Sequence, residues 1–200
     1  MLSEGSKRTL IESYQKHFQE HGASPMATQQ SFEGQLARFI KLAEIGDLRG
    51  KRVLDLGCGI ADLYPVLREK HGELEYCGID IVPEFITHAA ARFPEARFAC
   101  QDILREPLSE DYDYGFISGI FNNEVPEGTE FLKAIVKAAF ARTTVGLGFN
   151  FTSTHVNFRN AGMMYHDPNE VMDFCLREVS PKLLLHHHYF RCDVAVFLYK

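Results

Sequence analysis

The amino-acid sequence predicts an α/β fold, with a mostly parallel seven-stranded sheet and an antiparallel pair of strands at its C-terminal end. From residue 52 onward, short apolar runs alternate with segments of helical periodicity, which is typical of parallel strands joined by crossover helices. The last two apolar runs follow each other without an intervening helix and therefore predict a hairpin. We expect helices on both faces of the sheet and two further helices ahead of it.

Apolar residues at helical spacing predict the two N-terminal helices. Tyr14 lies among apolar residues on one face of a helix over 7–22, and Pro25 marks the loop that follows. A second helix, over 32–46, is predicted to close at Gly46.

Apolar runs that stop at turn residues predict the strands. The run after Gly50 stops at a glycine turn, the next stops at Asp80, and a third stops at Asp102. Helical periodicity returns between these runs, with Pro83 in the first turn of one segment. The predicted strands span 52–56, 73–79, 98–100, 112–118, 143–151, 182–189 and 192–199, and the helices between them span 62–69, 83–91, 129–140 and 169–177.

The composition indicates one compact globular domain. The chain has 200 residues, 46% of them hydrophobic and 24% charged, so it can bury a core without disulfide or metal staples. A formal net charge of -6 argues against a general nucleic-acid binder, which needs a concentrated basic surface. A local basic groove stays open as an alternative. A small molecule is the expected partner.

Cysteine usage and hydropathy predict a cytoplasmic protein. The 5 cysteines form no CxxC pair and mostly lie in apolar runs, which favours buried free thiols in a reducing compartment. The chain shows no secretory signal and no apolar stretch near the roughly 20 residues that span a membrane. The histidines at 186–188 alternate across a predicted strand and cannot converge on one ion, so no metal site is predicted.

The most informative segment is the turn after the first predicted strand. Gly57 and Gly59 let the backbone turn tightly and approach a ligand, and the helix that follows offers free amide groups. A dinucleotide fingerprint would need a third glycine at position 62, where this chain has Asp62. A carboxylate there would repel a pyrophosphate, whereas a nucleoside that carries an amino acid meets no such repulsion.

Residues 53–63, VLDLGCGIADL, resemble the glycine-rich motif of class I S-adenosylmethionine-dependent methyltransferases. The family commonly has a third glycine where this chain has Ala61, a change that adds no charge. The resemblance covers residues 50–150 and implies a Rossmann-like fold with S-adenosyl-L-methionine as cofactor. It also implies a catalytic domain over 49–200 and a helical lid over 1–48 within one compact molecule.

The resemblance assigns cofactor binding to residues at the ends of the second and third strands. Asp80 would accept both ribose hydroxyls, and Ile81 follows it at the same strand end. Asp102 would accept the adenine amino group, while the backbone amide of Ile103 donates to a ring nitrogen. Each carboxylate also has a plainer interpretation, because Asp80 could cap the helix that follows and Asp102 could close a loop.

The first and fourth strands complete the predicted cofactor site. Asp55, the acidic residue of the motif, would help to hold the methionine amino group beside Gly57 and Gly59. Ser118 ends the strand that would run beneath the methionine part. On the second helix, the planar guanidinium of Arg38 could pair with the methionine carboxylate, or could simply be a solvated surface group.

The predicted catalytic residues are Tyr14, Asn122 and Tyr165. Tyr14 could close over the site as part of the lid, or could serve ordinary helix packing. Asn122, with its neighbour Asn123, and Tyr165 lie in irregular segments that are rich in hydrogen-bonding groups and form a candidate substrate wall. His155 and His166 are possible proton acceptors.

Methyl transfer to a small metabolite is the leading functional hypothesis. In-line displacement at a sulfonium gains most from orientation and a desolvated pocket, so an obvious base is not required. One alternative is a cyclase that acts on the cofactor alone and yields azetidine-2-carboxylate and methylthioadenosine. Another is a non-catalytic partner protein that binds the cofactor. The acceptor and the oligomeric state are left open.

Overall fold

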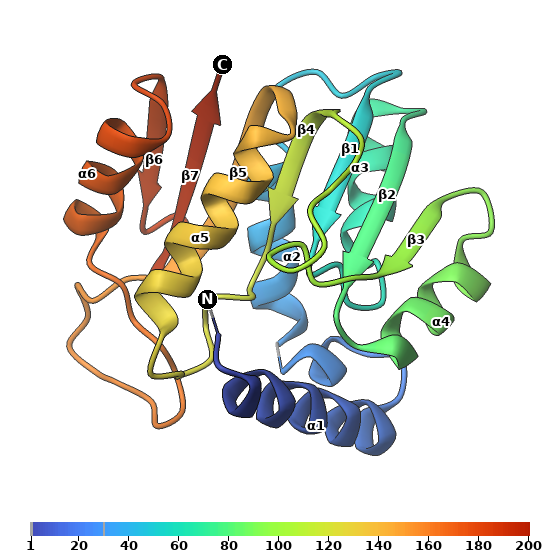
Figure 1. Ribbon diagram of the computed structural model, residues 1–200, viewed down its shortest axis with the longest axis horizontal. Helices are drawn as coiled ribbons and strands as arrows, with labels where there is room; N and C mark the ends of the chain where they lie inside the picture. Colours follow the sequence, from blue (N-terminus) through green and yellow to red (C-terminus); the bar gives the residue numbers. More distant parts are fainter. Residues whose placement is uncertain (1, 30) are drawn as a thin grey trace.

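One seven-stranded sheet forms the centre of the molecule in the computed structural model, which describes residues 2–29 and 31–200. The strands are β1 (Arg52–Leu56), β2 (Glu75–Asp80), β3 (Arg97–Cys100), β4 (Tyr112–Ile117), β5 (Thr143–Thr152), β6 (Leu183–His187) and β7 (Asp193–Tyr199). They follow the order β3-β2-β1-β4-β5-β7-β6 across the sheet (Figure 1). The strands from β3 to β5 are parallel, whereas β7 runs antiparallel to both β5 and β6. The predicted fold class is therefore confirmed, including the C-terminal antiparallel pair.

Helices cover both faces of the sheet, as predicted. They are α1 (Glu4–His21), the 3-10 turn η1 (Pro25–Thr28), α2 (Phe32–Leu42), α3 (Leu63–His71), α4 (Pro83–Arg92), α5 (Gly128–Ala141) and α6 (Pro168–Glu178). Side chains of α2, α3 and α4 share a core cluster on one face, while those of α5 and α6 fill the opposite face. Figure 1 shows α5 in front of the sheet and α2 behind it.

The helix α1 lies apart from these two layers, across the carboxyl ends of the parallel strands (Figure 1). Ser3 caps its start by accepting a hydrogen bond from the amide of Ser6. None of its described residues is buried, although Phe18 contacts the ring of Phe85 edge-on with 5.5 Å between ring centroids. An element with so little buried surface can open at low cost in free energy. The lid over residues 1–48 stays a prediction, and α1 is the part of it that the structure places over the strand ends.

The helix α2 instead belongs to the main core. Phe39 and Leu42 are buried in the same cluster as Phe197 of β7. The predicted helix was too long, because α2 ends at Leu42 and residues 43–46 form turns. Gly46 marks a close approach rather than the helix end: a Cβ added to it would lie 2.5 Å from the hydroxyl oxygen of Tyr114.

The C-terminal hairpin is shorter than predicted. β6 ends at His187 because His188 and Arg191 adopt left-handed backbone conformations, with φ of 57° and 45°, in the turn that leads to β7. His188 therefore lies outside the strand on which the three histidines were placed. Within the residues described, no group of three or more His, Cys, Asp or Glu side chains is arranged to hold a metal ion.

The cysteines are all free thiols, but the prediction that they are buried is only partly correct. Cys58, Cys77 and Cys175 are buried, whereas Cys192 is half-buried and Cys100 is exposed. Cys100 ends β3, which is an edge strand with a neighbour on one side only. In the part of the chain that the structure describes, no helix is both long enough and apolar enough to cross a bilayer.

Candidate functional site

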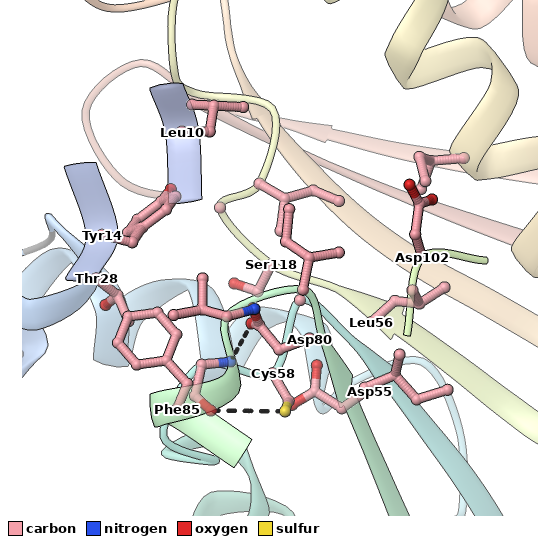
Figure 2. Close-up of a pocket in the computed structure, with 18 of the residues that line it drawn as sticks. Leu10, Tyr14, Thr28, Asp55, Leu56, Cys58, Asp80, Phe85, Asp102 and Ser118 are labelled. Atoms are coloured by element: carbon pink, nitrogen blue, oxygen red, sulfur yellow. Dashed lines mark hydrogen bonds between the residues drawn. The ribbon is translucent and has the colours of Figure 1, made fainter. Parts of the chain in front are cut away.

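A cavity lies between the carboxyl ends of the parallel strands and α1 (Figure 2). Leu10 and Tyr14 project into it from α1, opposite the side chains at the strand ends (Figure 2). This is the edge at which open α/β sheets bind their ligands. All residues predicted to bind the cofactor except Arg38 line this cavity, namely Asp55, Gly57, Gly59, Asp80, Ile81, Asp102, Ile103 and Ser118.

The glycine turn between β1 and α3 supplies backbone to one wall. Gly57 and Gly59 have φ of +72° and +54°, which side chains rarely permit. A Cβ on Gly57 would lie 2.2 Å from Cγ2 of Ile120, and one on Gly59 would lie 2.9 Å from Cγ2 of Thr28. Both glycines therefore hold open a space that a larger residue would fill.

Ala61 stands where the family motif commonly has its third glycine, and its backbone is left-handed. Its φ is 62°, a left-handed value that costs a non-glycine residue roughly 1 kcal/mol. The side chain is fully buried in the core beneath the turn and does not line the cavity. The methyl group of Ala61 therefore adds nothing to the cavity wall.

Asp80 links the glycine turn to the end of β2. One carboxylate oxygen accepts the amide N–H of Gly59 at 2.9 Å, and the other accepts that of Val82 at 2.9 Å. The bond to Val82 is local but is not the predicted helix cap, because Val82 is itself the N-cap of α4 and no described side chain caps that helix. Burial raises the pKa of Asp80, while the bonds from the backbone amides lower it.

Asp55 lies at the base of the cavity, where Tyr76 donates a hydrogen bond to it from β2. The carboxylate of Asp55 is buried, and this burial is the main reason that its pKa is raised to about 7. The hydrogen bond from Tyr76 lowers this pKa, and the neighbouring charge of Asp80 raises it further. A cation placed beside Asp55 would favour its ionised form.

Asp102 stands at the end of the cavity beyond β3, in contact with α1. Lys7 of α1 places its Nζ 2.7 Å from Oδ2 of Asp102, and the amide of Leu104 donates to Oδ1 at 3.1 Å. The predicted loop-closing role of Asp102 is therefore present alongside its position in the cavity. Ile103 is buried beside it and lines the same end.

The described lining carries more negative than positive charge. Four carboxylates line the cavity, those of Asp55, Asp62, Asp80 and Asp102, against the single cation Lys7. Asp62 pairs with Arg92 on α4. Such a site disfavours a pyrophosphate, as the carboxylate of Asp62 predicted, and suits a ligand with a positive group.

Tyr14 alone among the predicted catalytic residues lines the cavity. Its hydroxyl accepts a hydrogen bond from the side-chain amide of Asn123 at 2.5 Å. Tyr14 is half-buried, and loss of solvent around its hydroxyl raises its pKa to about 12. The two other predicted catalytic residues are not among those that line this cavity: Asn122 accepts a hydrogen bond from Thr152, and Tyr165 lines a separate pocket beside α5 and α6.

Arg38 is also placed differently from the prediction. It is buried rather than solvated, and its NH1 lies 3.0 Å from Oδ2 of Asp193 at the start of β7. It is not among the residues that line the cavity. The structure thus shows Arg38 in an ion pair that joins α2 to the sheet.

Lys7 lines the cavity but was not predicted, although the sequence carried a signal for it. Lys7 precedes Leu10 by three positions and Tyr14 by seven, which places all three on one face of α1. Asn123 was predicted together with Asn122 as part of the substrate wall, and of these two only Asn123 lines the cavity.

The sheet order and the cavity at the strand ends define a Rossmann-like fold. The family model described as a methyltransferase domain matches residues 53–139, which confirms the predicted resemblance. The Mycobacterium tuberculosis protein Rv1506c, which carries a methyltransferase name, is 29% identical over 152 residues, or 73% of this chain and 91% of that protein.

Solved structures of methyltransferases share the fold over nearly the whole chain. Magnesium protoporphyrin IX methyltransferase from Synechocystis PCC 6803, with bound SAM, superposes with a TM-score of 0.69 at 15% identity, covering 100% of this chain and 98% of that one. The DhpI–SAM–HEP complex superposes with a TM-score of 0.71 at 13% identity, covering 98% and 99%. These likenesses confirm the architecture.

Proposed function

We propose that this protein binds S-adenosyl-L-methionine (SAM) and transfers its methyl group to a small-molecule acceptor. The observation that carries the proposal is the convergence of Asp55, Asp80 and Asp102 on one cavity beside a glycine turn. The match to a methyltransferase domain and the solved neighbours that hold SAM or S-adenosylhomocysteine support it.

The three carboxylates suit three different groups of the cofactor. Asp80 is held by backbone amides and faces the cavity, so it can accept the two ribose hydroxyls. Asp102 would accept the adenine amino group at the far end. Asp55, whose pKa is raised to about 7, would be ionised by a neighbouring ammonium group.

The cofactor, when bound, supplies a methyl group on a positively charged sulfur. The residues of this chain would bind and orient the acceptor and exclude water from it. Phe39, Ile120 and Leu10 give apolar wall, and Asn123 and Tyr14 give polar groups. A phenol is protonated at neutral pH, and the raised pKa of Tyr14 makes it a still weaker acid, so it can donate a hydrogen bond to an acceptor.

The histidines considered as proton acceptors do not line this cavity. His166 is buried with its Nε2 3.2 Å from the backbone oxygen of Phe121, and His155 lines a separate surface pocket. An acceptor that already presents a lone pair therefore fits the site best. The roof that α1 forms over the cavity favours a small acceptor.

The decisive experiment measures products as well as binding. Binding of SAM to the purified protein is first measured by calorimetric titration. The protein is then incubated with SAM, either alone or together with cell metabolites smaller than about 1 kDa, a size limit that includes any ligand of a single cavity. We expect saturable binding, and S-adenosylhomocysteine that forms only when the metabolites are present.

Other outcomes point to the alternatives. Methylthioadenosine formed without metabolites would indicate the cyclase. Binding without turnover in any fraction would indicate the non-catalytic partner. No measurable binding of SAM would refute the proposal.

A further inference from the structure

A buried asparagine on β5 supports the cavity from behind without lining it. Asn150 is fully buried, and it is not among the residues of the cavity wall. Its side chain reaches the carboxyl end of β4, where Ser118 and Gly119 do line the cavity.

Two hydrogen bonds connect this side chain to the wall. The carbonyl oxygen of Asn150 accepts the backbone N–H of Gly119 at 2.9 Å. Its amide group donates to Oγ of Ser118 at 3.1 Å. A buried amide that uses both of its ends on two consecutive residues fixes their position and their direction.

The turn that Asn150 holds has little freedom to shift. Gly119 has φ of +79°, which glycine adopts without strain but with much freedom, so the bond from its amide to Asn150 is what fixes it. The next residue, Ile120, lies against the opposite glycine turn, since a Cβ on Gly57 would come within 2.2 Å of it. A displacement of Gly119 would therefore change the distance between the two strand-end turns that enclose the cavity.

We propose that Asn150 is a positioning residue that sets the β4 turn, and with it the cofactor affinity of the site. The inference rests on the proposed binding of S-adenosyl-L-methionine. Asn150 acts through Ser118 and Gly119, so its loss should affect binding more than it affects folding.

The test compares three variants of the full chain. Asn150→Leu keeps the approximate size and removes both bonds, Asn150→Asp keeps an acceptor for Gly119, and Thr152→Val is the matched control. Thr152 lies on the same strand and is equally buried, and its hydroxyl donates to Asn122, which does not line the cavity. Calorimetric affinity for SAM, the melting temperature without ligand, and the NMR signal of the Gly119 amide are measured for each.

We expect Asn150→Leu to weaken SAM binding by about tenfold or more, in line with the loss of two buried hydrogen bonds. Thr152→Val should lower the melting temperature about as much as Asn150→Leu does, but it should leave the SAM affinity within about twofold of wild type. Asn150→Asp should recover part of the affinity that Asn150→Leu loses. The Gly119 amide should exchange with solvent faster in Asn150→Leu and stay protected in Asn150→Asp.

Two results would overturn the inference. One is unchanged SAM affinity in Asn150→Leu, and the other is equal loss of affinity in Thr152→Val. If Asn150→Leu fails to fold, SAM affinity is measured instead for Ser118→Ala, for Asn150→Asp and for the two combined. Additive effects of the two substitutions would refute the coupling between Asn150 and Ser118. Failure of the wild-type chain to bind SAM would instead refute the proposed function, and Gly119 protection would still test the positioning role.

Discussion

Lys7 on the first helix and Asp102 at the end of the cavity form an ion pair, with 2.7 Å between Nζ and Oδ2. Each side chain is 21% exposed, so the pair is partly shielded from solvent. It joins a helix without buried residues to a strand end that would bind adenine. The same carboxylate thus faces both the helix that covers the cavity and the ligand proposed for it.

Removal of this pair should loosen α1. In Lys7→Met we expect faster hydrogen exchange across residues 4–21 in the absence of ligand, while global stability falls by only about 1 kcal/mol or less, as is usual for exposed or half-exposed pairs. Hydrogen exchange followed by mass spectrometry measures the first effect and urea unfolding the second.

The matched control is Lys16→Met on the same helix. Lys16 is 72% exposed and lies 3.9 Å from Glu20 within α1, so its loss breaks no contact with the sheet. Equal exchange rates in the two variants would show that the pair with Asp102 does not hold the helix.

Loss of the Asp80 charge should weaken binding of S-adenosyl-L-methionine. In the wild type, the carboxylate of Asp80 accepts hydrogen bonds from the amides of Gly59 and Val82. Asp80→Asn keeps the size of the side chain, but its NH2 group is a donor and cannot accept one of these two bonds. A hydrogen bond to a charged group contributes about 1.5–3 kcal/mol, so we expect an affinity lower by about 10-fold to 150-fold in calorimetry.

Asp113→Asn separates this effect from general damage. Asp113 on β4 also accepts a backbone amide, from Arg52 at 2.8 Å, but does not line the cavity. An affinity that falls equally in both variants would argue against a cofactor role for Asp80.

How far the sequence predicts this molecule depends on whether the signal is local. Strand ends were predictable because a buried run, a turn and a polar residue are adjacent in the chain, as at Asp80 and Asp102. The same logic located the glycine turn and the C-terminal hairpin.

The misplaced residues depend on contacts between distant segments. Arg38 pairs with Asp193, which is 155 positions away, and no periodicity near Arg38 indicates that partner. Tyr165 lies in an irregular segment whose path over the sheet is decided by packing against α5 and α6. The spacing of residues along a helix shows which of them share a face, but not which distant segment that face covers. For this reason the position of Lys7 over the cavity was not predicted.

Arg38→Met provides a test of what this arginine does. Removing one partner of a buried ion pair leaves the other charge uncompensated and costs about 3–5 kcal/mol. Because Arg38 and Asp193 are both buried, we expect a loss of stability of this order in urea unfolding without ligand. Arg38→Met combined with Asp193→Leu should recover part of it.

The control is Lys41→Met on the same helix, which breaks the short-range pair with Glu44 and should change stability by less than about 1 kcal/mol. If Arg38 instead bound the methionine carboxylate, as the family resemblance implied, Arg38→Met would leave the stability of the ligand-free protein intact and reduce SAM affinity.

The raised pKa of Asp55 predicts that the ligand-free protein loses stability as pH rises. The pKa is about 7 in the folded protein against 3.8 for the ordinary group, so the native state holds a proton that the unfolded chain has released over most of this interval. The stabilisation is complete below pH 4 and disappears as the pH passes through 7. From pH 5 to pH 8 it amounts to about 2–3 kcal/mol, at 1.36 kcal/mol for each unit of pH.

Asp55→Asn does not titrate at this position and should lack this part of the pH dependence, while its amide oxygen can still accept the hydrogen bond from Tyr76. Urea unfolding of both proteins at pH 5 and pH 8 isolates the contribution of Asp55, because all other groups are shared. Between pH 5 and pH 8, we expect the free energy of unfolding of the variant to rise by about 2 kcal/mol relative to that of the wild type. Affinity for S-adenosyl-L-methionine should show the opposite trend in the wild type, increasing toward pH 8 as the carboxylate that would receive the ammonium group becomes ionised. Parallel stability profiles for the two proteins would mean that Asp55 is already charged at pH 5.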